Sequence, residues 1–396
     1  MRYYTQKSIG KETVMTNKDT DITFQVSANL PAVYTAAHFI SGIPMIKNIM
    51  LRNIPENLCT DLAIVIEGKC SSGTILDFRF EKKNLRFGSV TAPDSDTAII
   101  NLEKHKILPK ADFMHKLSAN TFARIQITVM LGNNVSSCIS NIKIAPFGLV
   151  CPEMPPELLC TYVLPDCEFA AKAEKKLSAE AKKIAEKRTV QTPKPLLYAE
   201  ALAAVMQSAK LTYSAVHREF YDGDCVIRDP DNLTESNLRS VSQTEAALLY
   251  CSCAERCGLR PGIVFLRKGA GAVKVLISIG LGDYYAGSTV SESIAELRER
   301  ILDREIFVFD VLGLLGTEDT DFARNVTETT NLVLKSSSTL SFAVDIYTSR
   351  LSGVSSLRPF DGTVAKDIYG GYESISDAVK RIDKNAAAVS VYGYSP

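Results

Sequence analysis

Hydrophobic positions divide this chain into a first part with alternating character and a second part with helical spacing. Between residues 22 and 150, short runs such as 61–67, 76–80 and 123–131 alternate apolar and polar residues, and turn residues separate the runs. In 168–188, apolar residues instead recur at steps of three and four. The pattern therefore predicts a β domain followed by a domain of mixed helices and strands.

The stretch 241–271 predicts a buried helix, a turn and a strand. An almost unbroken apolar run at 246–253 indicates a helix that is buried on most sides. Gly258 stands where the end of a helix favours a positive φ, and Pro261 prevents the helix from resuming. The apolar residues 263–266 then predict a short strand.

This stretch resembles the core of the transglutaminase-like (papain-like) fold, in which a catalytic Cys opens a buried helix and a Gly-Leu-x-Pro turn precedes the strand that leads to the catalytic His. It is most similar to the transglutaminase-like region of large bacterial proteins that also carry a superfamily-one helicase. A gap-free alignment through 248–261 places Gln243 at the Cys position, Glu245 at an Asp position and Ala270 at the His position. An amide does not ionise to a nucleophile, and an Ala side chain cannot take a proton. The resemblance therefore implies the fold without the chemistry.

Further matches to the same group follow in the same order along the chain. They are the segments 34–36, 42–46, 51–53, 156–159, 162–165, 345–346, 350 and 357–359. Asp310, in the predicted strand 306–312, is the candidate for the polar residue that orients the His in active relatives. The resemblance covers residues 22–360 and implies an immunoglobulin-like β-sandwich joined to a degenerate transglutaminase-like domain.

We therefore predict an α+β protein with four parts. Residues 1–21 form a flexible N-terminal arm, and 22–150 form the immunoglobulin-like β-sandwich. Residues 151–360 form the catalytically degenerate transglutaminase-like domain, and 361–396 form an extension with one helix. Prolines within 147–165 predict a stiff hinge between the two halves.

Composition excludes several classes of protein. Lys and Arg together number 45, as do Asp and Glu, so a bulk attraction to nucleic acid is not expected. The sequence has no apolar run of the roughly 20 residues that span a bilayer, and its polar N-terminus does not resemble a signal peptide. It also lacks the Gly-x-x-x-x-Gly-Lys-Ser/Thr loop of ATPases. These features favour a cytoplasmic protein without a nucleotide cofactor.

The ten cysteines are best interpreted as reduced core thiols, and we predict neither a metal site nor a cofactor. An alternative is a cysteine hydrolase or acyltransferase whose nucleophile has moved. Cys225, Cys251 and Cys253 are then the candidate nucleophiles, and His217 is the candidate base. A second alternative is a nucleic-acid-binding accessory protein, because lysines crowd one face of the helix predicted at 168–188.

Our first hypothesis is a non-catalytic binding or scaffolding protein. The former catalytic pocket would be lined by Gln243, Glu245, Ala270 and Asp310, which either hydrogen-bond a ligand or fill the space. By analogy with the helicase-linked group, the partner is a separately encoded helicase or nuclease of a bacterial nucleic-acid-processing or phage-defence complex.

Overall fold

A computed structural model describes residues 22–55, 58–87, 97–188, 192–235, 239–268, 273–282, 288–315 and 321–358. The chain divides into two compact units, Met1–Met154 (unit 1) and Pro155–Pro396 (unit 2). Each unit is described by itself below. The predicted arm at 1–21 and the predicted extension at 361–396 lie outside the described residues.

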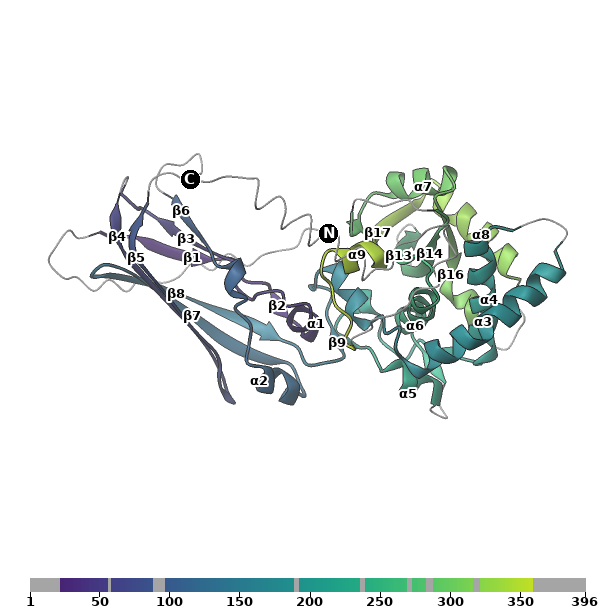
Figure 1. Ribbon diagram of the computed structural model, residues 1–396, viewed down its shortest axis with the longest axis horizontal. Coiled ribbons are helices and arrows are strands. Elements are labelled where there is room, and N and C mark those ends of the chain that lie inside the picture. Colours follow the sequence, from purple (N-terminus) through teal and green to yellow (C-terminus); the bar gives the residue numbers. More distant parts are fainter. Residues whose placement is uncertain are drawn as a thin grey trace. The chain divides into compact units, whose positions relative to one another are not determined.

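Unit 1 is built mainly from β-strands (Figure 1). Its strands are β1 (Gln25–Ala28), β2 (Val33–Tyr34), β3 (Asn48–Arg52), β4 (Cys59–Cys70), β5 (Gly73–Arg86), β6 (Thr97–Asn101), β7 (Thr121–Leu131), β8 (Asn134–Ile144) and β9 (Leu149–Val150). Its short helices are α1 (Ala36–Ile40), the 3₁₀ helix η1 (Glu103–His105) and α2 (Ala111–Lys116).

Within the described residues, eight strands of unit 1 form a sheet of five strands and a sheet of three, and the short β9 belongs to neither. The strand orders are β2-β8-β7-β4-β5 and β1-β3-β6. The predicted alternation explains the burial of the central strands: in β7, Ala123, Ile125, Ile127, Val129 and Leu131 are buried, and the residues between them are not. Buried side chains from both sheets make one continuous hydrophobic core.

Unit 2 mixes helices and strands, so the predicted α+β class is confirmed. Its helices are η2 (Pro156–Tyr162), α3 (Glu168–Glu186), α4 (Lys194–Ser208), η3 (Phe220–Asp222), α5 (Pro230–Glu235), α6 (Gln243–Arg256), α7 (Ile294–Leu302), η4 (Val311–Leu314), α8 (Phe322–Leu334) and α9 (Ile346–Leu351). Its strands are β10 (Thr212–Tyr213), β11 (Cys225–Val226), β12 (Ser240–Val241), β13 (Pro261–Lys268), β14 (Val273–Gly280), β15 (Val290–Ser291), β16 (Ile306–Asp310) and β17 (Ser338–Asp345).

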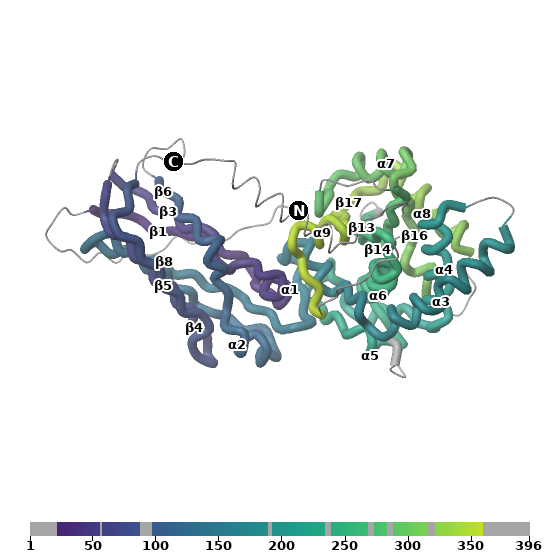
Figure 2. Tube along the Cα trace, viewed as in Figure 1, coloured from purple at the N-terminus to yellow at the C-terminus, as the bar shows by residue number. Residues whose placement is uncertain are grey.

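Helix α6 is the core element of unit 2. It packs against α3 and α4 and against strands β13 and β14, as the tube trace in Figure 2 also shows. The two strands belong to an antiparallel sheet with the order β15-β17-β13-β14-β16. Side chains on the opposite face of this sheet pack against α7 and α8. After the helix, Gly258 has a φ of 78°, the left-handed conformation that the sequence predicts there.

The segment predicted as a hinge differs from expectation in its second half. Residues Pro156–Tyr162 form the 3₁₀ helix η2, and Leu158, Leu159 and Tyr162 are buried. The prolines start this helix instead of forming a linker, because its apolar side chains enter the core of unit 2. Among the described residues, none of the helices has both the length and the apolar character that crossing a membrane requires.

Candidate functional site

The first turn of α6 is where the resemblance places the catalytic nucleophile. The helix begins after Ser242, whose hydroxyl accepts the backbone N–H of Glu245 at 3.0 Å. The Glu245 carboxylate in turn accepts the N–H of Ser242 at 3.0 Å, which completes a capping box. The sequence Ser-x-x-Glu thus explains where the helix starts, and it fixes the orientation of Gln243 and Thr244 in the first turn.

A buried carboxylate from Glu219 occupies the N-terminus of α6. Its two oxygens accept the backbone N–H groups of Gln243 at 2.7 Å and Thr244 at 3.1 Å, and the Thr244 hydroxyl donates to it at 2.8 Å. Burial raises the pKa of Glu219 in spite of these hydrogen bonds. The free N–H groups and the positive end of the helix dipole make this position an anion site, and here the protein's own side chain fills it.

The Gln243 side chain connects α6 to the sheet. Its amide oxygen accepts the backbone N–H of Val275 in β14 at 3.1 Å, and its amide nitrogen donates to the Tyr221 hydroxyl at 3.4 Å. Gln243 is only 6 % exposed. An amide whose oxygen satisfies a buried backbone group holds the helix against the strand, and removing it would leave that group without its acceptor.

Glu245 forms a forked ion pair with Arg228. The guanidinium Nε and Nη2 lie 2.8 and 2.6 Å from the two carboxylate oxygens, and the Arg228 backbone N–H donates to the same carboxylate at 3.2 Å. Burial of Glu245 raises its pKa, but the hydrogen bonds from Arg228 and the N–H of Ser242 outweigh burial and hold the pKa below its ordinary value. Glu245 therefore remains charged at neutral pH and is fully engaged inside unit 2.

Asp310 points to the face of the sheet opposite α6. It stands directly across from Leu276, which packs in the cluster on the α7 and α8 face, whereas its neighbour Phe309 makes a T-shaped contact with the ring of Tyr250 in α6. The Asp310 carboxylate lies 2.6 Å from Nζ of Lys274 and accepts the N–H of Leu312 at 3.0 Å. The structure therefore brings Gln243 and Glu245 into one helical turn and places the Asp310 side chain elsewhere. The other predicted pocket residue, Ala270, lies outside the described residues.

The candidate residues of a relocated thiol enzyme are buried. Cys225 is 4 % exposed, and Cys251 and Cys253 are fully buried within α6. Burial raises the pKa of both thiols in α6 well above the usual value for Cys, which disfavours the nucleophilic thiolate. The Nε2 atom of His217, the candidate base, lies 3.0 Å from the hydroxyl of Ser240.

The lysine-rich face of α3 carries carboxylates as well as ammonium groups. Lys172 pairs with Glu168 at 2.7 Å and Lys183 with Glu180 at 2.8 Å. These pairs lie at the exposed helical spacings that contribute little to stability but cancel local charge. The face is therefore less basic than its lysines alone suggest.

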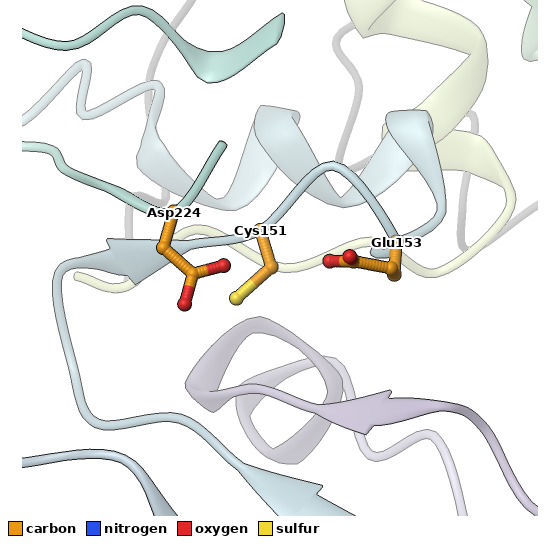
Figure 3. Close-up of side chains that lie close together, drawn as sticks. All are labelled: Cys151, Glu153 and Asp224. Atoms are coloured by element: carbon orange, nitrogen blue, oxygen red, sulfur yellow. The ribbon is translucent and has the colours of Figure 1, made fainter. Parts of the chain in front are cut away.

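Three further side chains with metal-binding atoms are drawn in Figure 3. Cys151 is buried and Glu153 is exposed, and both belong to the end of unit 1, whereas the half-buried Asp224 belongs to unit 2. Because the three residues come from different units, we assign no metal site to them.

No sequence pattern indicates the two residues that organise the first turn of α6. Glu219 and Arg228 lie in the polar segment before the helix, 24 and 17 residues from their main partners Gln243 and Glu245. A buried charge in a turn-rich segment has no local pattern that would distinguish it from an exposed one.

A scan against family models found no match for this chain, and a search of the curated proteins also found none.

Proposed function

We propose that this protein is a non-catalytic binding or scaffolding protein built from an immunoglobulin-like β-sandwich and a degenerate transglutaminase-like domain. The observation that carries the proposal is the first turn of α6. There an amide stands at the position of the nucleophile and is bonded to β14, and the Glu219 carboxylate fills the end of the helix. A reacting group at that position needs a nucleophile and space for a developing anion, and both are taken by internal bonds.

The two finer fold assignments rest on resemblance and are consistent with the elements observed. Unit 1 has two sheets around a common core, which suits a β-sandwich. Unit 2 has a buried helix packed on an antiparallel sheet, which suits the transglutaminase-like fold. By the same resemblance, the partner we propose is a separately encoded helicase or nuclease of a bacterial nucleic-acid-processing or phage-defence complex.

Thiol reactivity in the native protein tests the non-catalytic assignment. Iodoacetamide labelling is followed at each cysteine by mass spectrometry over a range of pH, with the protein unfolded in urea as the reference for full labelling. We expect Cys59, which is exposed, to label fastest and the half-buried Cys70 to follow. The buried Cys225, Cys251 and Cys253 should label only on unfolding.

The rival hypothesis of a relocated nucleophile predicts the opposite order. One of the three buried thiols would then label quickly at neutral pH, and His217→Ala would abolish its labelling without changing that of Cys59. That result would overturn the proposal and direct attention to acyl substrates.

A further inference from the structure

Strand β5 forms an edge of the five-stranded sheet in unit 1. Among the described residues, β4 is the only strand that pairs with β5, and near the start of β5 the carbonyl of Ile75 also accepts the backbone N–H of Lys110 at 2.8 Å. An edge strand presents a row of N–H and C=O groups on its open side, and another strand can pair with them. β5 has 14 residues, whereas strands of about five or six residues are typical. The edge is therefore long enough to accept a complete additional strand.

Charged residues of opposite sign alternate along the outer face of β5. Asp77, Arg79 and Glu81 stand opposite residues of β4 that are only half-buried, and all three are exposed, as is Lys83. The Arg79 and Asp77 side chains approach only to 3.9 Å and are more than half exposed, so they form at most a weak pair. Both signs of charge thus remain accessible at the edge.

On the other face of β5, aromatic side chains extend the hydrophobic core to the open edge of the sheet. Phe78 and Phe80 stand opposite the buried Ile66 and Ile64 of β4, yet both aromatic rings are only half-buried. The ring of His105 packs against them, with centroids 5.7 Å from Phe78 and 5.0 Å from Phe80. The two faces of the edge therefore differ in character, one charged and one aromatic.

We propose that β5 pairs antiparallel with β5 of a second copy of this chain, about a two-fold axis at Phe80. In this register Arg79 stands opposite Glu81 of the partner subunit, and Asp77 stands opposite Lys83 of the partner subunit. The symmetry repeats both pairs, so opposite charges meet at four positions on the outer face. On the aromatic face, Phe80 meets its own copy and Phe78 faces Lys82 of the partner subunit, which suits ring packing and a cation–π contact.

The other antiparallel registers are less complementary. An axis at Arg79 places Asp77 opposite Glu81 of the partner subunit, and an axis at Glu81 places Arg79 opposite Lys83 of the partner subunit; like charges then face each other. An axis at Phe78 or Lys82 keeps one kind of opposite-charge pair instead of two. An axis that falls between two residues pairs a charged residue of one copy with an aromatic-face residue of the other, so the two kinds of face meet on the same side of the joined sheet. The sequence of β5 thus selects one register.

The geometry of β5 limits the paired segment to residues 77–83. Asn84 has a φ of 49°, and the register with β4 shifts between Lys82 and Leu85, so the strand becomes irregular beside Lys83. The proposed pairing ends where the regular strand ends. It does not depend on the proposed function of unit 2.

The test is a charge swap read by sedimentation velocity on the full chain over a wide range of protein concentration. We expect the unmodified protein to form dimers, and Arg79→Glu to weaken dimerisation about tenfold or more because two opposite-charge pairs become like-charge pairs. Glu81→Arg should weaken it equally, and the double variant R79E/E81R should restore it. Arg124→Glu is the matched control: Arg124 is exposed on β7, within the same sheet but away from its edge.

Three outcomes would overturn the proposal. The first is an unmodified protein that remains monomeric at every concentration. The second is a loss with Arg124→Glu equal to that with Arg79→Glu, which would indicate an effect of net charge. The third is a double variant that stays as weak as the single variants although its circular dichroism matches that of the unmodified protein.

Discussion

Breaking the Glu245–Arg228 pair should lower the free energy of unfolding of unit 2, because the pair is a buried structural contact. The Glu245 side chain is 2 % exposed and accepts three hydrogen bonds from Arg228 besides the N–H of Ser242. Removing one partner of a buried ion pair typically costs about 3–5 kcal/mol, and losing a helix cap costs about 1 kcal/mol.

The Arg228 side chain moderates this cost. It is 31 % exposed and keeps a hydrogen bond of 2.7 Å to the carbonyl of Ser240, so water solvates part of its charge after the change. We therefore expect Glu245→Gln to lower the free energy of unfolding of unit 2 by about 3 kcal/mol. Glu245→Gln combined with Arg228→Met should cost less than the sum of the single changes, with a coupling of about 2 kcal/mol.

The buried thiols of α6 supply an assay for this unit alone. Cys253 is fully buried, so the rate at which it is labelled in increasing urea reports the opening of unit 2 whatever unit 1 does. A coupling below about 0.5 kcal/mol, the ordinary limit of additivity, would refute the view that the pair acts as one unit. Glu296→Gln, at the start of α7, is the control. If it lowers the free energy of unfolding as much as Glu245→Gln does, the capping box and the ion pair have no special importance.

Acidic pH and a second ion pair provide two further predictions on the same assay. Glu219 has a pKa raised above its ordinary value of 4.5, so protonation favours the folded state; its contribution to stability is present below pH 4.5 and is lost as the pH rises through the folded-state pKa. The free energy of unfolding of Glu219→Gln minus that of the unmodified protein should therefore increase as the pH rises from 4 to 7. A difference that stays constant or decreases would contradict this. Arg350 and Glu255 are 8 % and 6 % exposed and lie 2.9 Å apart. Arg350→Met should cost about 3–5 kcal/mol, and a loss below 1 kcal/mol would contradict a buried pair.

Helices with strong local patterns could be read from the sequence, whereas the extent of an edge strand could not. The apolar run of α6 and the glycine after it indicate both its burial and its end, and the structure has the helix at Gln243–Arg256. For β5 the alternation predicts only 76–80, yet the strand runs from Gly73 to Arg86. Its later part, 81–86, consists mostly of exposed charged residues with Leu85 as the only apolar residue, so it carries no alternating signal.

The relation between site residues depends on long-range register, which the sequence leaves open. The strand that contains Asp310 is predictable, but the face its side chain takes follows from its pairing with Leu276. A shift of one residue in that pairing would have turned Asp310 toward α6. The role of Glu219 depends in the same way on a contact across 24 residues. Predicting that contact requires the fold itself.

The two units use their charged residues differently, and this difference indicates where a binding surface should be sought. In unit 2, two carboxylates at α6 and one on the opposite face of the sheet satisfy internal donors: Glu219 the helix end, Glu245 the Arg228 guanidinium, and Asp310 the ammonium of Lys274. Groups bonded in this way would have to break those bonds before they could hold a ligand, and each break carries the cost worked out above. In β5, by contrast, Arg79 and Glu81 are exposed on an edge whose backbone can still accept a strand. If the protein acts by binding, as we propose, that edge is a better candidate surface than the pocket predicted by resemblance.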